Sequence, residues 1–149
     1  MTEFSPTTAF RLVRRLAAIG QDKASLYLLI SDTAAIQAVR ADIAAEVEVQ
    51  LGVRLQAFAA EEVRPDKLED VFTRDGGSPV TLIALDRWIA ELVRALDRNI
   101  VLLTGTGAVL LLANHKAAEQ TLRAAPNLRS RLTDILTISP DEAFRGVPA

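Results

Sequence analysis

The segment Pro79–Lys116, PVTLIALDRWIAELVRALDRNIVLLTGTGAVLLLANHK, sets the fold class. It contains two continuous apolar runs, Val80–Leu85 and Ala108–Ala113. Neither run alternates between apolar and polar residues, which is typical of parallel strands that helices cover on both faces. A crossover between parallel strands needs about a dozen residues, and the connection between these two runs is longer than that. The segment therefore predicts a strand, a helix and a second parallel strand.

The residues between the two runs predict an amphipathic helix. Apolar side chains recur there at three- and four-residue spacing and define one stripe, made of Trp88, Ile89, Leu92, Val93 and Leu96. Asp86 stands where an N-cap belongs, because a carboxylate there can accept a backbone N–H of the first turn. Ile100–Leu103 is open to two interpretations, since it either extends the helix or forms a short extended piece before Gly105.

The rest of the chain repeats this alternation of helices and strands. Apolar spacing and turn residues first predict a helix that starts at a Ser5 or Thr8 cap and ends at Gly20, a strand over Ala24–Ile30, and a long helix capped by Ser31, Asp32 or Thr33 and closed by Gly52. A strand over Val53–Ala59 and a short helix over Pro65–Phe72 are predicted next. After the central segment we expect a helix over Lys116–Ala125, a short turn over Asn127–Leu132, a strand over Thr133–Ile138 and a short terminal helix after Ser139. We therefore expect one domain over residues 1–149. Its predicted fold is three-layer α/β, Rossmann-like or P-loop-NTPase-like, with helices on both faces of a mostly parallel five-stranded sheet.

Composition narrows the function classes. The chain has 149 residues, half of them hydrophobic, which is enough for one core. Its net charge of −2 gives no general attraction to nucleic acid or an anionic membrane. With no cysteine and one histidine, it has no thiol nucleophile, disulfide or multi-histidine metal site. The start lacks a secretory signal, and no apolar run reaches the roughly 20 residues that span a bilayer. We expect a soluble, cytoplasmic protein that binds neither nucleic acid nor membrane.

The carboxyl ends of the predicted strands carry the candidate ligand residues. Ligands of open parallel sheets bind beyond these ends, where this chain places Ser31, Asp32, Asp86, Asn114 and His115. Asp32 and Asp86 could share a Mg²⁺, which prefers carboxylate oxygens, although both also stand at cap positions. His115 could act as a general base oriented by an aspartate, or make a cap or loop contact. We favour the structural roles and expect no metal, no cofactor and no catalytic residue.

The sequence predicts no phosphate-binding loop. A Walker loop or a dinucleotide fingerprint lies between a strand and a helix, whereas the glycines of Gly105–Gly107 precede a strand. No Gly-Lys-Ser or Gly-Lys-Thr occurs, and the SDTAAI that follows the first strand has neither glycine nor lysine. We interpret the Gly-Thr-Gly stretch as a turn.

The first predicted helix has an apolar face and a basic face. The apolar face consists of Phe10, Val13, Leu16, Ala17 and Ile19. Arg11, Arg14 and Arg15 form the basic face, which could bind a phosphate or a protein, or simply be solvated. Trp88 is a second candidate contact residue, either in the core or between subunits.

The last third of the chain carries a family likeness. Leu96–Asn99 lies near the position of a family helix of the form LN-x-x-R-x-x-L, Ala108–Ala113 matches the strand that follows it, and Ala125–Arg131 matches a closing APDLWSWRS motif, with Asn127 in place of its aspartate. The segment thus resembles the P-loop-lacking, NTPase-like α/β domain found with bacterial STAND NTPases and tetratricopeptide repeats. The resemblance implies an adaptor or scaffold in signalling or antiphage defence, and it supplies no catalytic site.

Three functional hypotheses follow. The first is a non-catalytic protein–protein interaction or adaptor domain, because a well-formed core lacks a catalytic constellation. The second is a small nucleotide- or phosphate-binding enzyme or sensor that uses the acidic edge of the sheet. The third is a self-assembling domain, in which arginine and acid/alanine helix faces pair between copies. We favour the first, with another protein or a further domain as the partner.

Overall fold

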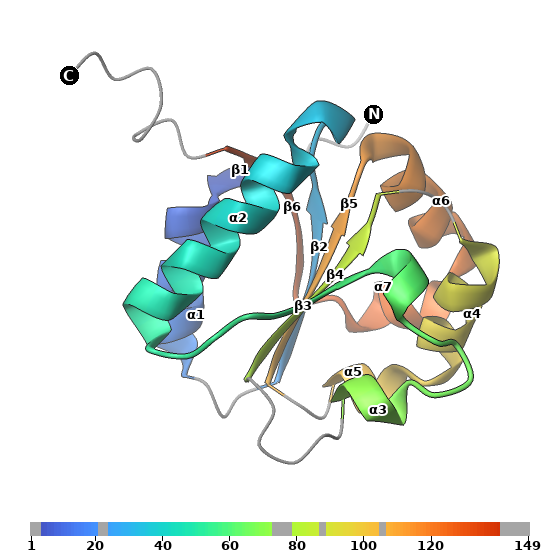
Figure 1. Cartoon of the computed structure of the whole chain (residues 1–149). Coiled ribbons are helices and arrows are strands. Elements are labelled where there is room, and N and C mark those ends of the chain that lie inside the picture. The colour runs from blue at the N-terminus through green and yellow to red at the C-terminus, as the bar shows by residue number, and fades with distance from the viewer. Residues whose placement is uncertain (1–3, 21–23, 73–78, 87–88, 105–106, 141–149) are drawn as a thin grey trace.

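The computed structural model describes residues 4–20, 24–72, 79–86, 89–104 and 107–140. Six strands form one sheet in the order β1-β6-β2-β5-β4-β3, and every pairing is parallel. Helices lie on both faces of the sheet (Figure 1). The predicted three-layer α/β fold is confirmed.

The strands are β1 (Ser5–Thr8), β2 (Ser25–Ile30), β3 (Gln56–Ala59), β4 (Val80–Leu85), β5 (Ala108–Ala113) and β6 (Asp134–Ser139). The helices are α1 (Ala9–Ile19), α2 (Ile36–Glu46), α3 (Glu69–Phe72), α4 (Ala90–Arg98), α5 (Ile100–Thr104), α6 (His115–Ala124) and α7 (Pro126–Arg131). Two 3-10 turns, η1 (Thr33–Ala35) and η3 (Ala60–Glu62), follow β2 and β3, and a π turn, η2 (Val47–Leu51), continues α2. In the part of the chain that these elements cover, no helix is long and apolar enough to cross a bilayer.

The central strands β2, β4 and β5 are buried at every position. Their side chains alternate between two cores, one on each face of the sheet. Tyr27 and Leu29 belong to the core beneath α1 and α2, whereas Leu26 and Leu28 belong to the core beneath α3–α7 (Figure 1). Because both faces are covered, every position must be apolar or small, which is the physical reason for the unbroken apolar runs in the sequence.

The sheet differs from the prediction at one edge. It has six strands rather than five, because Ser5–Thr8 pairs with β6 from Ser5↔Leu136 to Thr8↔Ser139. This short strand is exposed or half-buried and contains Pro6, so neither burial nor propensity marks it in the sequence. Proline is tolerated at such an edge position, where no neighbour requires its missing N–H.

The predicted helix caps are confirmed at one site and wrong at two. Thr8 caps α1, since its hydroxyl accepts the backbone N–H of Arg11 at 3.4 Å. Asp86 does not cap the next helix, because α4 begins four residues later, after Ile89. Asp32 precedes η1 but makes no side-chain cap bond. Neither aspartate therefore closes a helix.

Several helix boundaries also change. The long helix predicted after β2 is divided into η1, α2 and η2, and the helix predicted over Pro65–Phe72 is reduced to α3. Ile100–Leu103 is helical as part of α5, and the predicted turn Asn127–Leu132 is mostly the helix α7. The predicted terminal helix after Ser139, Trp88 and the first two residues of the Gly-Thr-Gly stretch lie outside the described residues.

Gly107 joins three strands at the amino-terminal edge of the sheet. Its φ is +52°, and its carbonyl accepts the N–H of Ser25 at 3.0 Å. The next residue, Ala108, donates its N–H to the carbonyl of Pro79 at 2.9 Å. A Cβ on Gly107 would collide with that same carbonyl. Both the backbone angle and the space therefore require glycine here.

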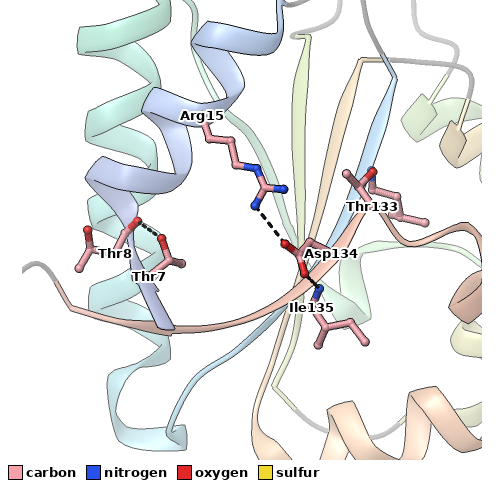
Figure 2. A network of polar contacts seen from close by, with 7 residues as sticks. Thr7, Thr8, Arg15, Thr133, Asp134 and Ile135 are labelled. Carbon is pink, nitrogen blue, oxygen red and sulfur yellow. Dashed lines mark hydrogen bonds and ion pairs between the residues drawn. The ribbon is translucent and has the colours of Figure 1, made fainter. Parts of the chain in front are cut away.

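Arg15 links α1 to β6 through an ion pair with Asp134 (Figure 2). Its guanidinium lies 3.1 Å from Asp134 Oδ2 and 5.4 Å from the centroid of the Tyr27 ring. The other oxygen of Asp134 accepts the N–H of Ile135 at 2.8 Å. Tyr27 is fully buried, and its hydroxyl has no hydrogen-bond partner among the described residues. Burial raises the pKa of the Tyr27 phenol; the charge of Arg15 opposes this, and the charge of Asp134 adds to it.

We expect Gly107→Ala to lower the free energy of unfolding by clearly more than Gly52→Ala does. Both glycines have positive φ, so both variants lose about 1–2 kcal/mol to backbone strain. Only at Gly107 does the added methyl group also meet backbone, because Gly52 has no atom within 4 Å of that position. Urea unfolding of the two variants measures the difference. Equal losses would mean that the Pro79 carbonyl moves away at no cost.

We expect Tyr27→Phe to keep or raise the free energy of unfolding at neutral pH, by up to about 1 kcal/mol, because it removes an unpaired buried hydroxyl. The raised pKa means that the fold favours the neutral phenol. The resulting stability is present below the ordinary pKa of 10.0 and is lost as the pH rises through the raised value.

Urea unfolding of wild type and Tyr27→Phe at about pH 8 and about pH 10.5 tests both points, since tyrosine titrates in that range. The wild type should lose more stability than the variant over this interval. A variant that is less stable at pH 8 would show that the hydroxyl is bonded in solution.

Candidate functional site

The strand register aligns the carboxyl ends of β2, β4 and β5. Leu85 pairs with Ala113, which pairs with Ile30, so the three strands end at one level. The sheet order also reverses here, because β2 leads to the far strand β3, whereas β5 leads to β6 on the other side of β2. The structure thus brings together the five predicted residues Ser31, Asp32, Asp86, Asn114 and His115, which we call the ligand edge. An edge at such a switch point is where open α/β sheets bind ligands.

Asn114 is the structural centre of the ligand edge. Its Nδ2 donates to the backbone carbonyl of Asp86 at 2.8 Å, which links the ends of β5 and β4. Its Oδ1 accepts the N–H of Ala117 at 2.8 Å and thereby caps α6. With both ends of the amide engaged, Asn114 holds the edge in place.

His115 and Asp32 form an exposed pair over β5 and β2. His115 Nε2 lies 3.2 Å from Asp32 Oδ1, and the two side chains are 66% and 82% exposed. Exposed pairs of this kind contribute about 0.2–1 kcal/mol. The predicted orienting aspartate is therefore in contact with the histidine, but water surrounds both groups. In the described part of the chain, no serine, threonine or tyrosine hydroxyl is hydrogen-bonded to this pair, so the histidine has no hydroxyl within reach to activate.

The two remaining residues of the ligand edge point inward. Ser31 is buried, and its hydroxyl donates to the carbonyl of Asp32 at 3.3 Å. Asp86 is half-buried, and its Oδ1 is enclosed without a hydrogen-bond partner among the described residues. Across those residues, no group of three or more histidine, aspartate or glutamate side chains is placed to hold a metal ion.

The loop after β2 folds as the tight turn η1. Ala35 donates its N–H to the carbonyl of Asp32 at 2.9 Å, which closes the turn. A phosphate-binding loop instead leaves several N–H groups open and follows them with a lysine. The SDTAAI segment supplies neither of these features.

A second candidate site lies on α1. Phe10 and Val49 are large apolar residues that are 43% and 80% exposed. Gln50 Nε2 donates to the Phe10 carbonyl at 3.1 Å, so their segments are held together. Arg11 and Arg14 are exposed beside Phe10 and have no ion pair within the described residues. We call Phe10, Arg11, Arg14 and Val49 the α1 surface.

The sequence located only part of the α1 surface. The arginines follow from the basic face of the helix, but Arg15 is engaged by Asp134, which is far away in the sequence. Phe10 was assigned to the apolar face, whereas Ala9, Leu12, Val13 and Leu16 are the buried residues of α1. Val49 lies in the π turn, where the helical spacing changes, and a period of 3.6 cannot place it.

We expect Asn114→Ala to cost about 2 kcal/mol, because it removes an N-cap worth about 1 kcal/mol and a hydrogen bond of similar worth. Asn114→Ser retains a cap acceptor and loses only the bond to Asp86, so it should cost about half as much. Urea unfolding of the two variants measures this order. Equal costs would assign the whole effect to the contact with β4.

Comparisons with known proteins are informative for the fold. No protein-family model and no curated protein matches the chain. A DNA polymerase III gamma-subunit-related protein from Thermotoga maritima aligns with a TM-score of 0.59 at 11% identity, over 92% of this chain and 48% of that one. The DnaC helicase loader aligns with a TM-score of 0.52 at 13% identity, over 91% of this chain and 94% of that one. The chain therefore spans about half of the first protein and nearly all of the second. The fold is P-loop-NTPase-like, as the resemblance implied.

Proposed function

We propose that this chain is a non-catalytic protein–protein interaction domain, which acts as an adaptor in a bacterial signalling or antiphage-defence system. The observation that carries the proposal is the α1 surface, where exposed apolar side chains lie beside two arginines that pair with no carboxylate of the described residues. Aromatic residues and arginine are the types most enriched at the centres of protein interfaces. The motif likeness to domains that accompany STAND NTPases supports the adaptor role.

The α1 surface is also held rigidly. Thr8 caps the start of α1, and Gln50 bonds both the Phe10 carbonyl and Glu46 Oε1, the latter at 2.9 Å. A surface that is ordered before binding loses less conformational entropy when a partner docks. Two arginines around an apolar centre suit a partner with an apolar patch bordered by carboxylates.

The test compares binding by variants on opposite faces of the sheet. Phe10→Ala combined with Arg14→Glu should abolish capture of the partner from a lysate of the source organism, because it removes the apolar anchor and reverses a charge. Arg129→Glu is the matched control, since Arg129 is an exposed arginine on α7, across the sheet. Quantitative mass spectrometry identifies proteins that wild type and the control retain and the α1 variant loses.

The purified partner is then titrated against all three proteins by calorimetry. We expect the α1 variant to bind at least about tenfold more weakly than wild type and the control. Equal binding by all three would remove the α1 surface from the function. Melting temperatures of the variants show whether any loss reflects folding.

A second candidate function is a nucleotide or phosphate sensor. The observation that favours it is the enclosed, unpartnered Oδ1 of Asp86, beside Asn114 at the switch point of the sheet. A ligand at 100 times its dissociation constant raises stability by about 2.7 kcal/mol, which a thermal-shift screen detects readily. The interaction proposal expects no shift with ATP, ADP, GTP or inorganic phosphate, with or without Mg²⁺. A shift that Asp86→Ala abolishes would favour the sensor instead.

A further inference from the structure

The α1 surface is part of a larger exposed face that α1 forms with α2 and η2. The two helices lie side by side on one face of the sheet (Figure 1). Gln50 in η2 donates to the Phe10 carbonyl at 3.1 Å, and Val49, its neighbour in the chain, is 80% exposed. Exposed apolar residues from α1 and η2 are therefore held next to each other. We call the outer side of α1, α2 and η2 the α1–α2 face.

The outer side of α2 lacks charged residues. Its exposed positions are Gln37, Ala41 and Ala45, and α1 adds the exposed Ala17 and Ala18. A surface helix usually presents charged and polar residues on its outward side. Alanine loses no side-chain entropy when it is buried, and small side chains allow helices to pack at short distances. These positions therefore suit contact with another helix layer better than contact with water.

Both signs of charge border the apolar residues of this face. Arg11 and Arg14 lie on α1, Glu48 lies beside Val49 on η2, and all three charged side chains are exposed. Within the described residues, neither arginine pairs with a carboxylate, and the Glu48 carboxylate pairs with no cation. The cations thus come from one element of the face and the anion from another, and each has an exposed apolar residue next to it.

Such an arrangement is complementary to a second copy of itself. A two-fold axis brings the same patch of two subunits together, so that each contact between two different residues occurs twice. An axis between α1 and η2 places the apolar residues of both copies at the centre and the cations of each opposite the anion of the other. Complementary charges of this kind fix the orientation of the two partners.

We propose that the α1–α2 face joins two copies of this chain into a two-fold symmetric dimer. Phe10 and Val49 of the two copies form its centre, and Arg14 pairs with Glu48 of the partner subunit. The exposed alanines of α1 and α2 pack around them. This inference rests on the proposed function, because it takes the same α1 surface and identifies its partner as a second copy.

Sedimentation equilibrium of the full chain between about 1 μM and about 1 mM measures the dissociation constant of the dimer. We expect wild type to dimerise within this range. Arg14→Glu and Glu48→Arg should each weaken the dimer at least about tenfold, because each places like charges opposite one another at two points. Arg129→Glu on α7 and Glu91→Arg on α4 change exposed charges elsewhere and are the matched controls, which should dimerise as wild type does.

A mixture of the Arg14→Glu and Glu48→Arg chains is the strongest test. In a two-fold pairing, the mixed dimer regains opposite charges at both points. The mixture should therefore dimerise about as tightly as wild type, although neither variant does so alone. The chain that carries both substitutions should also dimerise, for the same reason. Recovery in the mixture shows in addition that both variants are folded.

Three results would overturn the dimer: wild type that remains monomeric at about 1 mM, controls that weaken association as much as the α1–α2 variants, or a mixture and a doubly substituted chain that stay monomeric. The capture experiment separates this inference from the adaptor function. If wild type is monomeric but Phe10→Ala with Arg14→Glu loses a different captured protein, the dimer is wrong and the adaptor function stands. If wild type dimerises but that variant retains every captured protein other than this chain, the adaptor function is wrong and the dimer stands.

Discussion

The burial of β2, β4 and β5 on both faces is the constraint on which the rest of this molecule depends. All eighteen positions of these three strands are buried; sixteen of them carry hydrophobic side chains, and Ser25 and Thr81 are the polar exceptions. A buried charge or unpaired polar group there would cost several kcal/mol, so polar chemistry is confined to the strand ends and the outer helices. The ligand edge and the α1 surface both lie outside this dry centre.

Some polar side chains that reach the interior have all their hydrogen bonds satisfied, and others do not. Asn114 uses both ends of its amide, and in doing so it joins two strands and begins a helix. Tyr27 and Asp86 each keep an enclosed oxygen without a partner among the described residues. For Tyr27, the ring packs beneath Arg15, and its apolar contacts offset the unpaired hydroxyl. Among the described residues, no group compensates the enclosed oxygen of Asp86 in this way.

The two edge strands of the sheet, β1 and β3, differ in what lies beside their unpaired backbone groups. At one edge, β1 is short, contains Pro6 and runs directly into the cap of α1, so it offers little surface for a further strand. At the other edge, β3 borders an acidic cavity and pairs on one side only. Exposed edges usually carry charges that discourage pairing with other chains. Here the charged residues lie on the neighbouring η3–α3 segment, where Glu62 Oε1 accepts the N–H of Ala59 at 2.8 Å.

Local sequence patterns were sufficient to predict the central strands, because a strand that is buried on both faces must be apolar throughout, as Val80–Leu85 and Ala108–Ala113 nearly are. The same logic placed Ser31, Asp32, Asp86, Asn114 and His115 at one edge, since parallel strands end on the same side. Contacts between distant residues were beyond that logic. The pairing of β1 with β6, the Arg15–Asp134 bridge and the cavity beside Phe58 all join segments that no short window contains. Capping shows this limit most clearly: Asp86 has the right chemistry for a cap, but α4 begins at Ala90, and where a helix begins depends on how it packs against the rest of the fold.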